Sequence, residues 1–355
     1  MAPVIREFQK YKYDIDLVIC ITAQHREMLD EVLRVFQITP NYDLDVMLKS
    51  QSPFEITSKV LIGIREVLLQ EKPDIVLVQG DTTTTFSTAL SAYYLKIPIG
   101  HIEAGLRTHD MYNPFPEELN RKMTSALSSY HFVPTESAKH NLLREGVDSK
   151  TIFLTGNTVI DALFWIIDNT GDIREKLVQS LPFLRSTTRR IILTTAHRRE
   201  SFGAPLRNIL TALRILVERN YNIEIVYPLH PNPNVQETAR EVLSNIERIH
   251  LIESLSYASF VHLMKEAYLI LTDSGGIQEE APSLGKPVLV MRSKTERPEA
   301  LEAGTAKLVG TDVNRIVEAT EKLLEDKCEY KRMANIRNPF GDGKASARIA
   351  EIVRR

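Results

Sequence analysis

The sequence has few cysteines, no long apolar run and no marked excess of charge, and each of these absences narrows the function. Its two cysteines, Cys20 and Cys328, are too few for a disulfide framework or a thiolate metal cluster. The 44 Lys and Arg residues nearly balance 46 Asp and Glu, which disfavours a nucleic-acid surface and favours a small ligand. The longest apolar runs are strand-sized and the start has no signal-peptide core, so we expect a soluble cytoplasmic protein that binds no membrane.

Strand-like and helix-like segments alternate along all 355 residues, which predicts an α/β fold with largely parallel sheets. We expect two Rossmann-like domains, at residues 1–168 and 169–336, with an active-site cleft between them and a C-terminal helix (337–355) packing back on the first domain. The predicted strands are residues 17–22, 75–78, 97–102, 131–133, 191–194, 223–227, 249–252, 269–272, 288–290 and 307–309. Residues 168–190 are polar and suit a linker plus one helix, whereas residues 1–8 suit a helix where such a domain normally opens with a strand.

Acidic residues follow two predicted strands of the first domain. Asp81 and Glu103 come where strands 75–78 and 97–102 end, and ligands of open parallel sheets bind beyond that edge. Asp81 has a structural alternative as the cap of the next helix, and Glu103 needs either a partner such as Arg107 or a function. Glu117 adds a third carboxylate near a helix start, where it would also favour the helix dipole.

The second domain presents basic groups and a small-residue turn at its strand ends. His197 and Arg198 follow strand 191–194, which favours an anion site over a salt-bridged surface cluster, and His230 has a similar position. The turn Ser274-Gly275-Gly276 after strand 269–272 would expose backbone N–H groups to a phosphate. Glu280 would accept ribose hydroxyls unless it is an exposed helix acid, and Arg297 would contact phosphate. The absence of a Walker A lysine motif and of G-x-G-x-x-G disfavours ATPase and NAD chemistry.

Seven motifs in order resemble the non-hydrolysing UDP-N-acetylglucosamine 2-epimerases: GDTTTT, HIEAGLRT, NPFPEELNR, TAHRRESFG, HPNPNV, DSGGIQEE and TERPE. The resemblance covers nearly the whole chain. It implies a glycosyltransferase-B-like architecture, a homodimer, and interconversion of UDP-GlcNAc with UDP-ManNAc without a cofactor or metal. In that family the C2 proton leaves as UDP departs from C1, and UDP adds back to the resulting 2-acetamidoglucal after reprotonation on the opposite face.

The resemblance also implies residue roles. The carboxylates Asp81, Glu103 and Glu117 would be acid/base groups, and His197 would stabilise the departing diphosphate. Uracil would lie against Leu255 and Phe260. The phosphates would meet Ser274, Gly275, Gly276 and Arg297, and the ribose would meet Glu280. A second, activating UDP-GlcNAc would be bound by Gln24, His25, Gln51, Glu118, Arg198 and His230.

The sequence departs from the family pattern at two places. Relatives begin with a strand and a GTRPEAIK-type loop that this sequence lacks, and Ser50 stands where many relatives carry arginine. Three other functions remain open. A retaining glycosyltransferase would share the UDP half-site, a nucleotide-sugar-binding protein would keep the pocket without turnover, and a hydrolysing epimerase would release free ManNAc.

Overall fold

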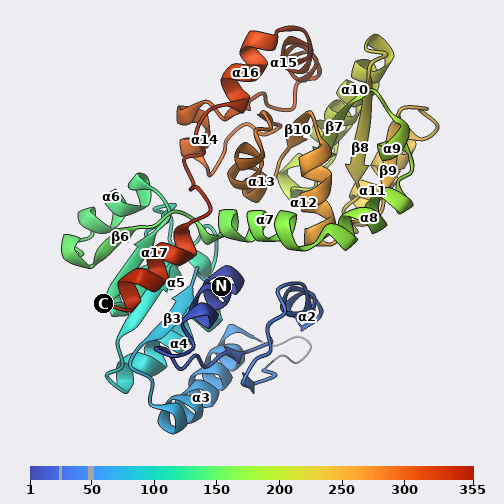
Figure 1. Cartoon of the computed structure of the whole chain (residues 1–355). Helices are drawn as coiled ribbons and strands as arrows, with labels where there is room; N and C mark the ends of the chain where they lie inside the picture. Colours follow the sequence, from blue (N-terminus) through green and yellow to red (C-terminus); the bar gives the residue numbers. More distant parts are fainter. Residues whose placement is uncertain (24–25, 47–51) are drawn as a thin grey trace. The chain divides into compact units, whose positions relative to one another are not determined.

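The computed structural model of the chain describes residues 1–23, 26–46 and 52–355 and divides them into two compact units (Figure 1). Unit 1 combines Met1–Ala162 with Phe340–Arg355, and unit 2 is the continuous segment Leu163–Pro339. The boundaries lie at 162/163 and 339/340 instead of the expected 168/169 and 336/337. Helix α7 (Thr158–Asn169) runs through the first boundary without a break, so no change in local sequence marks it.

Unit 1 is built on a parallel sheet with the order β3-β4-β5-β6. Its strands are β3 (Val76–Gln79), β4 (Ile99–Ile102), β5 (Tyr130–Val133) and β6 (Ile152–Leu154). The sequence did not predict β6, which is short and ends on a half-exposed Leu154. The predicted strand at 17–22 is only the two-residue β1 (Cys20–Ile21), which pairs with β2 (Tyr42–Asp43) in a separate sheet.

Capping residues and apolar stripes define the helices of unit 1. Helix α3 (Pro53–Glu71) starts with a reciprocal capping box between Ser52 and Glu55 and buries Val60, Ile64 and Val67 at helical spacing. Most of this stripe belongs to the apolar cluster that also contains Val78 and Ile99 of the sheet. The other helices are α1 (Ala2–Phe8), η1 (Gln9–Tyr11), α2 (Arg26–Val35), α4 (Thr83–Tyr94), α5 (Glu117–Leu127), α6 (Glu136–Arg144), η2 (Ser149–Thr151) and α17 (Ala345–Val353).

The last helix of the chain completes the core of unit 1. Val4 and Phe8 of α1 share an apolar cluster with Ile349 and Ala350 of α17, and Phe132 of the sheet lies in the same cluster. The carboxylate of Asp161 accepts the N–H groups that open α17, at 3.2 Å from Ala345 and 2.7 Å from Ser346. Both ends of the chain therefore contribute to one core.

Unit 2 is a doubly wound sheet of six parallel strands in the order β12-β11-β10-β7-β8-β9. These are β7 (Arg190–Thr195), β8 (Ile223–Pro228), β9 (Ile249–Ile252), β10 (Leu269–Thr272), β11 (Val288–Val290) and β12 (Ala306–Leu308). The chain runs outward from β7 to β9 and then crosses to the other side of β7 at β10. The strand order therefore reverses between β7 and β10, which is where doubly wound sheets bind their ligands.

Helices cover the sheet of unit 2, and long apolar side chains of α10 and α15 pack on its strands in one cluster. The helices are α8 (Gly171–Ser180), α9 (Phe183–Ser186), η3 (Arg199–Ser201), α10 (Ala204–Arg219), α11 (Pro233–Leu243), α12 (Tyr257–Glu266), α13 (Gly275–Glu280), η4 (Ala281–Leu284), α14 (Pro298–Ala303), α15 (Val313–Glu325) and α16 (Lys327–Ala334). The polar segment 168–190 holds two helices, α8 and α9, where the sequence predicted one.

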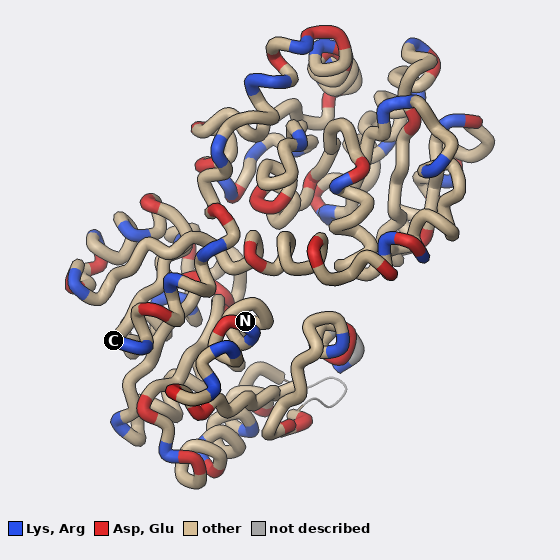
Figure 2. The backbone as a smooth tube through the Cα atoms, in the orientation of Figure 1, with Lys and Arg blue, Asp and Glu red and all other residues tan. Residues whose placement is uncertain are grey.

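The predicted α/β class with parallel sheets is confirmed, because every strand pair in the described residues is parallel. Figure 2 shows basic and acidic residues interspersed along the backbone of both units. None of the described helices combines the length and apolar character needed to span a bilayer.

Candidate active site

Asp81 and Glu103 follow neighbouring strands at the carboxyl edge of the unit 1 sheet. Gln79, the last residue of β3, pairs with Ile102, the last residue of β4, so the two acids leave the sheet side by side. Gly80, between β3 and Asp81, has φ +75°, and a Cβ on it would lie 3.8 Å from Glu103 Oε2. The carboxylate of Glu103 therefore lies against the turn that presents Asp81.

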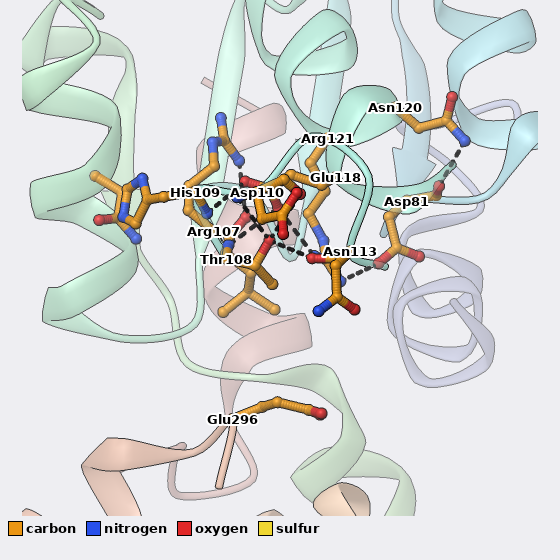
Figure 3. A network of polar contacts seen from close by, with 12 residues as sticks. Asp81, Arg107, Thr108, His109, Asp110, Asn113, Glu118, Asn120, Arg121 and Glu296 are labelled. Carbon is orange, nitrogen blue, oxygen red and sulfur yellow. Dashed lines mark hydrogen bonds and ion pairs between the residues drawn. The ribbon is translucent and has the colours of Figure 1, made fainter. Parts of the chain in front are cut away.

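Two residues of helix α5 hold Asp81 in place (Figure 3). Arg121 Nη2 lies 2.5 Å from Asp81 Oδ2, and Asn120 Nδ2 donates to the Asp81 carbonyl oxygen at 2.9 Å. The alternative role of Asp81 as a helix cap is wrong, because the Thr82 side chain accepts the capping N–H from Thr85 at 3.2 Å. The carboxylate of Asp81 thus does not cap α4 and instead pairs with the guanidinium of Arg121.

Glu103 adopts a backbone conformation that is costly for a glutamate. Its φ is +63°, in the left-handed region, and non-glycine residues held there are concentrated at functional sites. Gln79 Nε2 donates to Glu103 Oε2 at 3.3 Å. The expected partner Arg107 instead makes a two-pronged pair with Glu145 at the end of α6, at 2.9 and 2.8 Å. Arg107 thus extends toward α6, so it does not provide the partner that was expected for Glu103.

The start of α5 carries two acids with different surroundings. Glu117 Oε2 is buried and has no hydrogen-bond partner in the described part of the chain. Glu118 is fully buried and accepts backbone N–H groups from Thr108 and His109, each at 3.1 Å, as well as Arg121 Nη1 at 3.2 Å. Glu118 therefore fixes the loop between β4 and α5, whereas Glu117 keeps an unused carboxylate oxygen.

His101, in β4, supports this edge although the sequence did not suggest it as a site residue. It is fully buried, and its Nε2 lies 2.8 Å from the carbonyl oxygen of Gly80. Burial lowers its pKa to about 3, so the imidazole is neutral and stabilises the Gly80 turn. No local pattern distinguishes such a histidine from a core residue.

In unit 2, His197 and Asp273 lie at the switch point between β7 and β10. Asp273 is fully buried, and its Oδ2 accepts the backbone N–H groups of His197 and Arg198 at 2.7 and 2.8 Å. The His197 ring stacks on that of His230, with centroids 5.2 Å apart and planes 12° from parallel. Burial lowers the pKa of His197, whereas Asp273 acts in the opposite direction.

The Ser274-Gly275-Gly276 turn opens α13 and has two guanidiniums beside it. A Cβ on Gly275 would lie 3.7 Å from Arg198 Nη2 and 3.9 Å from Arg297 Nη2. Arg297 also pairs with Glu279 through its Nε. Two cations beside a turn of small residues form an arrangement that suits a diphosphate.

Glu280 is buried within unit 2, so the alternative of an exposed helix acid is wrong. Its carboxylate accepts a hydrogen bond from the Tyr257 hydroxyl at the start of α12. Burial raises its pKa to about 7, partly offset by the Tyr257 bond. Leu255 and Phe260, on either side of Tyr257, are half-buried. The pair Tyr257–Glu280 thus joins α12 to α13.

Glu280 makes the stability of unit 2 dependent on pH. Because its folded-state pKa of about 7 lies above the usual 4.5, the native state binds the proton more tightly than the unfolded state. This stabilisation is complete below pH 4.5 and is lost as the pH rises through 7. In the wild type, this group should lower the free energy of unfolding by about 3 kcal/mol as the pH rises. We expect Glu280→Gln to lack this pH-dependent loss.

This expectation can be measured by urea unfolding at several pH values from 4.5 to 8. Glu302→Gln, at an exposed position of α14, is the matched control and should keep the wild-type decline. Equal pH dependence in Glu280→Gln and wild type would contradict the assignment.

The remaining predicted residues include some outside the described structure. Gln24, His25 and Gln51 lie outside the described residues, as does Ser50. Of the other residues predicted to bind a second nucleotide sugar, Arg198 and His230 lie beside His197, and Glu118 is engaged as described above. No cluster of three or more His, Cys, Asp or Glu suited to a metal ion occurs among the described residues.

Comparisons with known proteins identify the family. A model of the UDP-N-acetylglucosamine 2-epimerase family matches residues 6–354. The UDP-N-acetylglucosamine 2-epimerase of Yersinia pestis is 55% identical over 339 residues, which cover 95% of this chain and 90% of that protein. That of Salmonella typhimurium is 52% identical over 357 residues, covering 100% and 94%.

Solved structures give the same result. The chain matches UDP-GlcNAc 2-epimerase from Neisseria meningitidis bound to UDP-GlcNAc with a TM-score of 0.88 and 51% identity, covering 99% of this chain and 95% of that one. The Methanocaldococcus jannaschii enzyme in complex with UDP-GlcNAc and UDP matches with a TM-score of 0.76 and 40% identity, over 99% and 95%. These neighbours have a glycosyltransferase-B-like fold. This chain belongs to the UDP-N-acetylglucosamine 2-epimerase family.

Proposed function

We propose that this protein interconverts UDP-GlcNAc and UDP-ManNAc by inverting C2 of the sugar, without hydrolysis. The observation that carries the proposal is family membership over the whole chain, since both units match relatives that are named for this reaction. We assign the acid/base chemistry to the carboxylates of unit 1 and the nucleotide to unit 2.

The proposed reaction begins with removal of the C2 proton by a carboxylate. The electrons of the C–H bond form the C1=C2 double bond, and the C1–O bond breaks so that UDP leaves with the bonding pair. Protonation of C2 from the opposite face and re-addition of the diphosphate oxygen to C1 complete the inversion. Two faces require two acid/base groups, and the proposal draws them from Asp81, Glu103 and Glu117.

The carboxylates of unit 1 suit this task in different ways. Arg121 pairs with the Asp81 carboxylate at 2.5 Å, and the left-handed backbone of Glu103 places that residue next to Gly80. Glu117 Oε2 is ready to accept a proton, because no donor in the described residues holds it. Enforced proximity to C2 would let such groups remove a weakly acidic proton.

The nucleotide is assigned to unit 2. The turn at 274–276 and Arg297 would hold the diphosphate, Glu280 the ribose, and Leu255 and Phe260 the uracil. His197 would stabilise the charge that develops on UDP as the C1–O bond breaks. Three of the described residues are proposed for the site of a second, activating UDP-GlcNAc. Arg198 and His230 lie beside His197, and Glu118 fixes the loop between β4 and α5 of unit 1.

The decisive experiment is incubation of the purified chain with UDP-GlcNAc in deuterated water, followed by NMR. We expect deuterium at C2 and the appearance of UDP-ManNAc. Free ManNAc would point to a hydrolysing epimerase, and sugar transfer without C2 exchange would point to a glycosyltransferase. Binding of UDP-GlcNAc without deuterium exchange at C2 and without product would indicate a nucleotide-sugar-binding protein.

We further propose a homodimer in the cytoplasm, as the family resemblance implies. Light scattering should then give about twice the chain mass of 40.4 kDa. Fractionation of cells that make the protein would test its location.

A further inference from the structure

A buried acid, Asp273, contacts the backbone of His197, the residue that we propose stabilises the departing diphosphate. It directly follows β10, and its N–H donates to the Thr195 carbonyl oxygen of β7 at 3.2 Å. Its side chain is 0% exposed, and Oδ2 is saturated by the N–H groups of His197 and Arg198. One oxygen thus fixes the backbone that carries the imidazole.

The second carboxylate oxygen points toward the imidazole itself. Asp273 Oδ1 is buried without a hydrogen-bond partner in the described residues, and it lies 3.5 Å from His197 Nδ1. A buried carboxylate oxygen without a donor is costly, so closing this gap to a hydrogen bond is favourable. Side-chain bonds of catalytic groups are often long without substrate and shorten when it binds.

Three groups face the His197 imidazole and set its charge. His230 stacks on the ring and Arg198 is adjacent in the chain, and both favour the neutral imidazole. Burial acts in the same direction, whereas Asp273 alone among these groups favours the imidazolium. Among these groups, the Asp273 carboxylate is therefore the one that stabilises the imidazolium against the neutral imidazole.

We infer that Asp273 is a positioning residue that holds His197 with its proton on Nδ1 and supports positive charge on the ring. The opposite nitrogen, Nε2, is then left for the departing diphosphate, so this inference rests on the proposed function. The acid acts through the histidine and does not touch the substrate. A carboxylate behind an imidazole fixes both the tautomer and the orientation of the ring.

Asp273→Asn tests this inference with little change in shape. The amide oxygen can still accept the two backbone N–H groups, whereas the amide nitrogen would take the place of Oδ1 and donate to Nδ1. The substitution removes the negative charge of the carboxylate, and the neutral His197 ring then carries its proton on Nε2 instead of Nδ1. Spectra of ¹⁵N-histidine-labelled protein, assigned with a His197→Gln variant, should show a proton on Nδ1 in wild type and on Nε2 in Asp273→Asn.

The pKa of His197 should fall by at least one unit in Asp273→Asn, and kcat for epimerisation at neutral pH should fall at least tenfold. KM should change less than threefold, because the effect arises as charge develops on the leaving group. Glu224→Gln is the matched control, since Glu224 is a buried acid at the opposite end of the same sheet and pairs with His250 at 2.9 Å. It should leave kcat and the His197 signals unchanged.

Two results would overturn the inference: a proton on Nε2 in wild-type His197, or an unchanged His197 pKa in Asp273→Asn. The first needs no variant, so it decides the matter even if Asp273→Asn does not fold. If wild type lacks epimerase activity while the spectra change as expected, the proposed function fails and the positioning role stands.

Discussion

Replacing Glu103 by Gln is expected to slow both C2 deuterium exchange and epimerisation by about 100- to 10,000-fold. The amide keeps the size of the side chain and can still accept the bond from Gln79 through its oxygen, but it cannot take a proton from C2. UDP affinity should stay within about threefold, because the groups assigned to the nucleotide lie in unit 2. Exchange measured by NMR and binding measured by calorimetry separate these two effects.

Glu136→Gln provides the matched control, since Glu136 is an exposed acid in the first turn of α6 in the same unit. It should retain wild-type exchange. Asp81→Asn and Glu117→Gln should also lose exchange strongly. Unchanged turnover in all three acid variants would remove the carboxylates of unit 1 from the mechanism.

Gly105→Ala is expected to destabilise unit 1 by about 2–5 kcal/mol, which combines about 1–3 for overpacking with about 1–2 for the left-handed backbone. Gly105 has φ +85°, and an added Cβ would overlap the Ala138 carbonyl oxygen and lie 2.9 Å from its carbon. The Leu142 side chain, 3.1 Å away, closes the other side. Since the clash involves the backbone of α6, a rotamer change cannot relieve it.

Comparison of Gly105→Ala with Gly146→Ala isolates the steric part of this effect. Gly146 also has φ +85°, but nothing lies within 4 Å of an added Cβ, so only the backbone cost of about 1–2 kcal/mol should appear. Hydrogen exchange of α6 and β5 amides measures the difference. The single tryptophan, Trp165, lies in unit 2, so its fluorescence serves as an internal reference. Equal losses in the two variants would contradict the predicted clash.

The strands of unit 2 were predictable because buried parallel strands are continuous apolar runs with polar flanks. Residues 249–252, 269–272 and 288–290 were predicted with the bounds that the structure has. In unit 1 the same rule overestimated the length of the strand at residues 17–22, because an apolar run becomes a long strand only where a partner strand lies alongside. Strand β6 was missed although its three residues are apolar, and in the structure only Ile152 of the three is buried.

The positions of the acids were predictable, whereas their partners were not. Asp81 and Glu103 follow from the rule that parallel strands end at one edge. The pairing of Arg107 with Glu145, and the burial of Glu280 beneath Tyr257, depend on how distant helices pack. The position of Asp273 behind His197 depends on the reversal of strand order between β7 and β10, which local sequence does not encode.

The two units differ in when they can be completed as the chain is synthesised. Unit 2 is one uninterrupted stretch, so it can fold as soon as residue 339 has emerged from the ribosome. Unit 1 must wait for residues 340–355, because α17 covers Val4, Phe8 and Phe132. The half that carries the acids is therefore the last to mature, and its nascent apolar surface is the part of the molecule that chaperones would protect longest.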